Sequence, residues 1–171
     1  MSVHIALPPM RKHFAGLLSF LSVVLVSSAS DFPTPYNSER GNPSPTTPRE
    51  ALSKIRLPEG FKATLFAAEP DVQNPIGCAW DHRGRLWVAE NYTYAETSKK
   101  FDLGLRDRVI ILEDTDHDGR AETRKVFTDT VQKLTSVEIG KGGVWVMAPP
   151  QLLFIPDANG DDVPDGPPEV A

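Results

Sequence analysis

The chain lacks the residues that build disulfide, zinc or covalent haem sites. Cys78 is its only cysteine among 171 residues, so no intramolecular disulfide can form. The sequence contains no C-x-x-C-H haem attachment motif and no Cys/His zinc cluster, which excludes a covalently bound haem in this chain. The alternation of Ile76, Cys78 and Trp80 predicts that Cys78 is a small buried apolar residue and that Trp80 belongs to a sheet core.

The sequence also has no apolar run as long as an ordinary membrane span, which takes about 20 residues. Its apolar stretch Phe14–Val26 follows Arg11 and Lys12 and precedes the small residues Ser27–Ser30. This order is typical of a signal peptide, which we predict over residues 1–30. We therefore expect an exported protein in the periplasm, at the cell surface or outside the cell, with no membrane span after cleavage. An uncleaved N-terminal anchor is the alternative.

Basic charge is scarce. Cleavage after residue 30 would remove Arg11 and Lys12 and no acid, leaving 16 basic residues against 23 acidic ones and a net charge of −7. An acidic surface argues against nucleic acid and anionic membranes as partners. It is compatible with cation binding.

What the sequence does contain predicts a linker, one short helix and many short strands. Residues 31–47 mix Pro with Ser, Thr, Asn and Gly, as linkers do. Thr47 as N-cap, Pro48 at the first helical position and Glu50 three residues after the cap predict a helix over residues 48–55. The expected strands lie at about 61–67, 76–80, 85–90, 108–113, 124–128, 134–139, 144–148 and 151–156.

Two acidic loops recur in the same context. Asp114–Glu122 follows the apolar run Val109–Leu112, and Asp157–Asp165 follows Leu152–Ile155, with the first aspartates 43 residues apart. That spacing is about the length of a propeller blade, roughly 40–45 residues. The fold is therefore predicted to be all-β, with about two blades of a β-propeller over residues 48–171, preceded by the short helix and the signal peptide.

A second pair of matching segments supports the repeat. Gly84–Ala89 parallels Gly142–Met147, and an insertion near Asn91–Asp107 accounts for the longer distance to the first acidic loop. Long loops on repeat scaffolds often lie on a functional face. Tyr92 and Tyr94 are therefore candidate ligand contacts, with a packing role as the favoured alternative.

The acidic loops have the spacing of an oxygen-ligand site. Ca²⁺ takes six to eight oxygen ligands, which alternate acidic residues can supply from a tightly curved segment. Gly160 and Asp162 depart from the pattern that places Gly at the sixth position, so the second loop matches it less closely. Neither loop is an EF-hand, because its twelfth position is Lys125 or Pro168 instead of Glu. The candidate ligands are Asp114, Asp116, Asp118, the Arg120 carbonyl and Glu122 in the first loop, and Asp157, Asn159, Asp161, the Val163 carbonyl and Asp165 in the second.

The acidic loops can also be interpreted as ordinary turns that bind no ion. Asp and Asn are common in tight turns and keep strand edges soluble. If Ca²⁺ binds, we expect it to be structural and to fix the hairpins. His82 lies in an Asp-x-x-Gly turn and is interpreted as a solvated turn residue. No Ser-His-Asp arrangement, P-loop or dinucleotide fingerprint is visible.

Five segments of the chain form a recognisable combination, namely Leu57–Phe61, Ala67–Pro70, Asn74–Ile76, Trp80–Glu90 and Leu152–Asp157. They resemble the propeller of PVC-type membrane-bound dehydrogenase proteins, a haem-binding protein family. The resemblance covers about residues 48–171 and implies a propeller related to the quinoprotein glucose/sorbosone dehydrogenases. It implies pyrroloquinoline quinone (PQQ) as a cofactor of full-length members, with further propeller blades and a cytochrome domain downstream. No residue here matches a catalytic, PQQ-binding or haem-binding position.

Together these features favour the N-terminal propeller segment of an exported dehydrogenase-like protein. Its activity would be that of a quinone-dependent sugar or alcohol oxidoreductase whose catalytic residues lie outside this chain. One alternative is a non-catalytic, calcium-stabilised propeller that binds carbohydrate or protein. Another is an inactive fragment.

Overall fold

A computed structural model describes residue 41, residues 44–94 and residues 100–171, which lie in a compact unit spanning Pro33–Ala171. The predicted signal peptide and most of the predicted linker fall outside these residues. No helix in the described part of the chain is long and apolar enough to cross a membrane.

The predicted helix is present as α1, Pro48–Lys54. Thr47 caps it, since its side-chain oxygen accepts a hydrogen bond from the Glu50 amide at 3.3 Å, and Pro48 stands in the first turn. The Glu50 side chain pairs with Lys54 at 2.7 Å. None of the helix residues is buried. The cap and this exposed pair therefore stabilise α1 more than any contact with a core.

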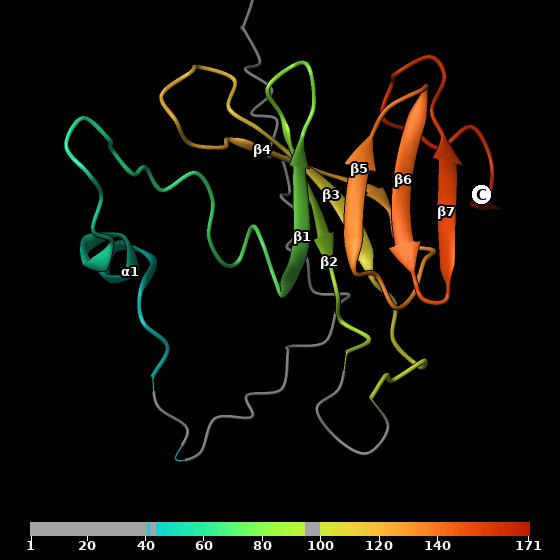
Figure 1. Ribbon diagram of the computed structural model, residues 1–171, viewed down its shortest axis with the longest axis horizontal. Helices are drawn as coiled ribbons and strands as arrows, with labels where there is room; N and C mark the ends of the chain where they lie inside the picture. The colour runs from blue at the N-terminus through green and yellow to red at the C-terminus, as the bar shows by residue number, and fades with distance from the viewer. Residues whose placement is uncertain (1–40, 42–43, 95–99) are drawn as a thin grey trace, which may run out of the picture. The chain divides into compact units, whose positions relative to one another are not determined.

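The rest of the described fold consists of two antiparallel sheets (Figure 1). Their strands are β1 (Pro75–Trp80), β2 (Leu86–Glu90), β3 (Arg108–Glu113), β4 (Thr123–Thr128), β5 (Ser136–Ile139), β6 (Gly143–Ala148), β7 (Gln151–Pro156) and β8 (Glu169–Val170). The first sheet has the order β1-β2-β3-β4 and the second β5-β6-β7-β8, so each is a four-stranded meander. The all-β prediction is confirmed, and seven of these strands lie within two residues of their predicted bounds.

The predicted strand at 61–67 is wrong. This segment has no regular secondary structure, and Phe66 and Ala67 pack with Val72 against the first sheet. Adjacent residues of a strand point to opposite faces, so a strand could not place both Phe66 and Ala67 on the same sheet. Phe61 is 72% exposed and takes no part in this packing. The short strand β8 was not predicted.

One buried core joins the facing sides of the two sheets. Its members are Trp87, Ala89, Val109, Ile111 and Phe127 from the first sheet, Val131 and Leu134 from the connection, and Val137, Val144, Val146, Ala148, Leu153 and Ile155 from the second. Gly77 permits the close approach of β1 to β5, because a Cβ atom at this position would lie 3.1 Å from the Ser136 Cα.

Cys78 and Trp80 lie outside this core, contrary to the prediction. Cys78 is exposed and Trp80 is 57% exposed. Their neighbours Gly77 and Ala79 are the β1 residues that share the core side, since they pair with Ala89 and Trp87 of β2. The alternation correctly separated the two faces of β1, but it could not show which face the second sheet covers.

Candidate functional site

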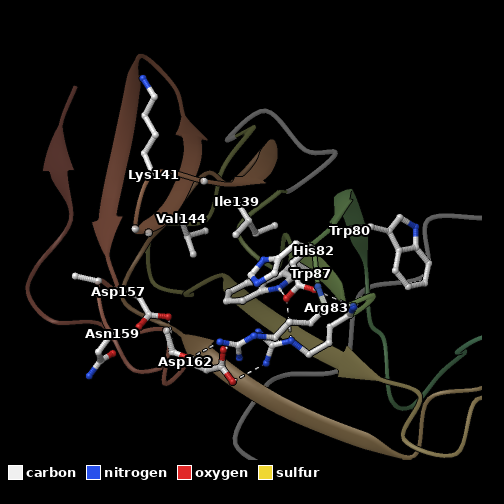
Figure 2. A pocket seen from close by; sticks show the side chains of 17 residues that line it. Trp80, His82, Arg83, Trp87, Ile139, Lys141, Val144, Asp157, Asn159 and Asp162 are labelled. Atoms are coloured by element: carbon white, nitrogen blue, oxygen red, sulfur yellow. Dashed lines mark hydrogen bonds and ion pairs between the residues drawn. The ribbon is translucent and has the colours of Figure 1, made fainter.

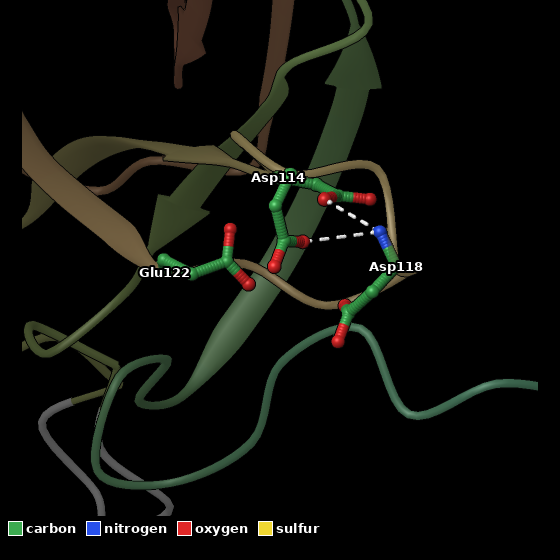
Figure 3. A group of neighbouring side chains, drawn as sticks. Asp114, Asp118 and Glu122 are labelled. Carbon is green, nitrogen blue, oxygen red and sulfur yellow. Dashed lines mark hydrogen bonds between the residues drawn. The ribbon is translucent and has the colours of Figure 1, made fainter.

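The first acidic loop connects β3 to β4 and gathers four carboxylates. Asp114, Asp116, Asp118 and Glu122 each place one oxygen within 4.8 Å of the others. Asp114 and Asp116 both accept a hydrogen bond from the Asp118 amide at 3.2 Å. These bonds hold the first two carboxylates on the inside of the curve. Figure 3 shows Asp114, Asp118 and Glu122 of this cluster. A converging set of carboxylate oxygens has the chemistry that a hard divalent cation prefers.

The second acidic loop, between β7 and β8, repeats the internal hydrogen bonds of the first at a constant offset of 43 residues. In the first loop the bonds run from the amides of Asp118 to Asp114 and Asp116, Gly119 to Asp114, Arg120 to Asp118 and Thr115 to Glu122. In the second they run from the amides of Asp161 to Asp157 and Asn159, Asp162 to Asp157, Val163 to Asp161 and Ala158 to Asp165. All the candidate ligand residues thus occupy equivalent places in one loop geometry.

The backbone conformations correspond as well. His117 and Gly160 at the fourth position have φ values of 62° and 68°, and Gly119 and Asp162 at the sixth have 92° and 64°. The second loop therefore adopts the geometry from which its sequence was expected to depart. Asp tolerates the left-handed region better than most residues other than glycine, which lets Asp162 replace glycine here.

The two loops differ in the charge at their third position. Asp116 in the first loop is replaced by Asn159 in the second, whose amide nitrogen donates to Asp161 at 3.0 Å. Among the described residues, the first loop is the one place where so many acids converge. The first loop therefore offers an ion more carboxylates than the second loop does. The electrostatic repulsion among its carboxylates is also greater.

Arg85 fastens the second acidic loop to the first sheet. It lies in the turn between β1 and β2, and its guanidinium binds Asp162 through two bonds of 2.7 and 2.9 Å. Its Nε donates to Asp81 at 2.8 Å, and Asp81 also accepts the indole N–H of Trp87 at 2.9 Å. Sequence reasoning missed this link, whose only trace is the acid at the glycine position of the loop.

These contacts shift the pKa values of the partners. The pKa of the Arg85 guanidinium is raised above its ordinary value, chiefly by its hydrogen bonds to Asp162. Burial acts to raise the pKa of Asp81, but the hydrogen bonds from Trp87 and Arg85 outweigh it and the pKa is lowered overall. Both groups are therefore held in their charged forms.

Two more basic residues of the first sheet reach the same loop. Arg83 donates to the Gly160 carbonyl at 3.1 Å, and the Lys125 ammonium donates to the Asp161 carbonyl at 2.8 Å. The second acidic loop is thus held by three cationic side chains from the neighbouring sheet. Because these side chains belong to the first sheet, an ordered second acidic loop helps to hold the two sheets together.

A cavity of about 440 Å³ lies between the β1–β2 turn, the β5–β6 turn and the second acidic loop (Figure 2). Trp87, Ile139 and Val144 supply apolar lining, and His82 and Arg83 supply polar groups. Lys141 contributes to the lining, but its side chain points away from the other labelled residues in Figure 2. Most of the other lining side chains are charged or polar, so the cavity is more polar than a typical small-molecule site.

The long insertion between β2 and β3 has a buried base. Tyr92 is 5% exposed, and its hydroxyl donates to Gln73 at 2.7 Å and accepts a hydrogen bond from Arg108. Burial, with the nearby charge of Glu90, raises the pKa of Tyr92 to about 12. Tyr92 is therefore a packing residue, in agreement with the favoured alternative. Tyr94 is 57% exposed and contacts Phe101, while residues 95–99 lie outside the described part.

The buried carboxylate of Asp107 ties this insertion to the connection between the two sheets. It accepts hydrogen bonds from the Thr93 amide at 2.7 Å and from the Leu134 amide at 2.8 Å. Asn91 donates to the Leu134 carbonyl at 2.6 Å. The polar residues of the insertion thus act at the junction of the two sheets.

Comparison with protein families gives one match. Residues 47–169 match the domain of unknown function DUF7133. Comparisons with curated proteins and with solved structures gave no match. The match covers both sheets and both acidic loops, and it assigns no activity, so the resemblance to PVC-type dehydrogenases stays a prediction. The chain belongs to the DUF7133 family.

Proposed function

We propose that this domain is a pair of consecutive β-propeller blades whose acidic loops bind Ca²⁺ as structural ions, within an exported dehydrogenase-like protein. The observation that carries the proposal is the repeated set of hydrogen bonds in the two loops, 43 residues apart. Each loop follows the third strand of a four-stranded meander, and the two meanders pack face to face. Radial repetition of such sheets is the organisation of a propeller.

The ion would act on the hairpins and on the sheet junction. In the first loop it would neutralise the four converging carboxylates, which otherwise repel one another. In the second loop it would order a segment that Arg83, Arg85 and Lys125 hold against the first sheet. Binding to the folded state alone stabilises a protein by mass action.

Any redox chemistry would arise outside the two sheets. The described residues supply two sheets, whereas a closed propeller has at least four. We propose that further blades complete the ring and that a PQQ-type cofactor and the catalytic groups belong to that complete form, with a cytochrome domain as electron acceptor. Dye-linked oxidation of sugars or alcohols by the complete form, and none by this chain alone, is the expected result.

Thermal unfolding with and without Ca²⁺ tests the structural role. At a Ca²⁺ concentration about 100 times the dissociation constant, one occupied site adds about 2.7 kcal/mol of stability. The midpoint should rise with Ca²⁺, fall back with excess chelator and respond less to Mg²⁺, which prefers a more regular octahedral set of ligands. An unchanged midpoint in millimolar Ca²⁺ would refute the proposal.

The cavity supports a second candidate, in which the propeller binds carbohydrate without catalysis. Trp80 borders the cavity and is 57% exposed, with its ring apart from the other labelled residues in Figure 2. Exposed indole rings beside hydrogen-bonding groups suit sugar rings. Titration with neutral oligosaccharides, followed by tryptophan fluorescence, should show saturable quenching that Trp80→Ala removes. Quenching that persists in Trp80→Ala would contradict a sugar site at this residue.

A further inference from the structure

We propose that a second copy of this chain packs head to tail on the first, joining the free faces of its two sheets. One face, called here the trailing face, belongs to the second sheet and consists of Trp145, Met147, Leu152 and Phe154. The other, the leading face, lies on β1 and consists of Ile76, Cys78 and Trp80. The proposal rests on the blade repeat of the proposed function and does not need its Ca²⁺ sites. It concerns this chain alone, in which a second copy takes the places that further blades take in the complete ring.

The trailing face corresponds to a face that is buried in the first sheet. Trp87 pairs with Ile111 and Ala89 with Val109 across β2 and β3, and all four belong to the core between the sheets. Trp145 pairs with Phe154 and Met147 with Leu152 across β6 and β7 in the same arrangement. The second sheet thus repeats the surface with which the first sheet binds its neighbour.

This repeated surface has no comparable cover. Leu152 is 41% exposed, and within the described residues none of the four side chains belongs to a core cluster. Trp145 and Phe154 are partly buried and pack on each other, with ring centroids 4.7 Å apart. An apolar sheet face left open in this way marks an interaction site.

The leading face is the counterpart. Cys78 and Trp80 pair with Val88 and Leu86 of β2. In the second sheet, Val137 and Ile139 pair with Val146 and Val144 in the same way, and this is the side of β5 that packs on the first sheet. Ile76 is 52% exposed, and Trp80 stays 57% exposed although Phe66 contacts its ring. The open side of β1 thus matches the side of β5 that meets the first sheet. On β2 and β3 the same side of the first sheet is already covered, because Val88, Ile110 and Leu112 are buried under Phe66, Ala67 and Val72.

The charges beside the two free faces are also complementary. Inside the chain, Arg83 contacts the second acidic loop at its Gly160 carbonyl. Lys141 occupies the place of Arg83 in the second sheet, and no ion pair of Lys141 appears in the described structure. In a head-to-tail pair, Lys141 would face the first acidic loop of the next copy. The four carboxylates of that loop complement its charge.

One residue weakens the fit. Glu138 pairs with Trp145 as Ala79 pairs with Trp87, so it places a carboxylate where the internal interface has a methyl group. Burying an unpaired charge is unfavourable. We therefore expect the association to be reversible. Glu138→Ala should associate more tightly, with an association constant about tenfold higher for each 1.4 kcal/mol of desolvation cost that it removes.

Two variants separate the faces. Leu152→Lys should block the trailing face, and Ile76→Lys should block the leading face. Four blades are enough to close a propeller, so two copies can join leading face to trailing face on both sides. The wild-type chain should therefore form this closed dimer or a larger ring as its concentration rises. Each variant alone should remain monomeric in sedimentation velocity. Their equimolar mixture should form a dimer and stop there, since only one unblocked face of each kind remains.

Leu103→Lys is the matched control, because Leu103 is 54% exposed in the insertion between β2 and β3 and belongs to neither face. It should associate like the wild type, and circular dichroism should show that all variants remain folded. A wild-type monomer at concentrations up to about 1 mM would overturn the proposal. A mixture of the two variants that does not dimerise would also overturn it. Dimerisation of Ile76→Lys alone would overturn it too, because it would indicate a two-fold contact between trailing faces. If such a monomer still gained stability from Ca²⁺, only the association would be refuted.

Discussion

Arg85 and Asp162 form a two-point ion pair across the sheet junction, with nitrogen–oxygen distances of 2.7 and 2.9 Å. The arginine comes from the turn before β2 and the aspartate from the loop after β7, and both side chains are largely buried. Arg85 also binds Asp81, which holds the indole of Trp87 in the core. Asp162 is thus connected to the core residue Trp87 through Arg85 and Asp81.

Replacement of Asp162 tests this connection. Asp162→Gly removes one partner of a buried pair, a loss of about 3 kcal/mol, and relieves about 1 kcal/mol of left-handed backbone strain. We expect a net loss of about 2 kcal/mol in urea unfolding. Asp162→Asn is the control, because Asn tolerates the same backbone and keeps a hydrogen-bond acceptor, so its loss should be smaller. Equal stability of Asp162→Gly and the wild type would show that the pair contributes nothing.

The lowered pKa of Asp81 predicts acid sensitivity. Between its folded and unfolded pKa values, the unfolded chain binds more protons at this site, so stability rises with pH. The contribution is complete above about pH 4, the ordinary value for Asp, and is lost as the pH falls through the folded value. Unfolding free energies measured from pH 5 to pH 2.5 should therefore fall more steeply for the wild type than for Asp81→Asn. Parallel curves would contradict this assignment.

Gly77 predicts how closely the sheets must approach. In Gly77→Ala, the new methyl carbon would lie 3.1 Å from the Ser136 Cα and 3.4 Å from the Thr135 carbonyl oxygen. Overpacking against backbone typically costs about 1–3 kcal/mol, and we expect a loss in that range. Gly140→Ala is the control, because a Cβ there meets nothing within 4 Å. It should be neutral or slightly stabilising. A neutral Gly77→Ala would show that β1 and β5 can separate freely.

Much of the fold could be predicted because it depends on local patterns. Alternating apolar residues located seven strands, and the spacing of Asp114 and Asp157 revealed a repeat that the two sheets confirm. The exposure of Cys78 and Trp80 could not be predicted in this way. Period-two alternation assigns residues to two faces of a strand, and the choice of the covered face depends on Gly77 meeting a strand about 60 residues later in the chain.

In the candidate site, too, local features could be predicted from the sequence and long-range contacts could not. The candidate ligand residues of both acidic loops were predicted from spacing alone, and the structure gives them equivalent local hydrogen bonds. Asp162 was interpreted as a departure from the loop pattern, but it keeps the loop geometry and binds Arg85, 77 residues away. A long-range ion pair leaves no periodic trace in a single sequence.

The third position of each loop offers a reciprocal exchange for the ion sites. Asp116→Asn should weaken Ca²⁺ binding to the first loop, because one carboxylate ligand is lost. Asn159→Asp should strengthen binding to the second loop, because it adds one. Affinity changes of about tenfold in opposite directions, measured by competition with a fluorescent chelator, are the expected result. Changes in the same direction would contradict the equivalence of the loops.

Isothermal titration of residues 33–171 with Ca²⁺ tests the central claim most directly, since the claim is that the two loops are equivalent ion-binding units of one repeat. We predict two binding events per chain, the tighter one lost in a variant in which Asp114 and Asp118 are both Asn, while the weaker one persists. The absence of binding heat at millimolar Ca²⁺, together with an unchanged thermal midpoint, would show that the acidic loops are ordinary turns.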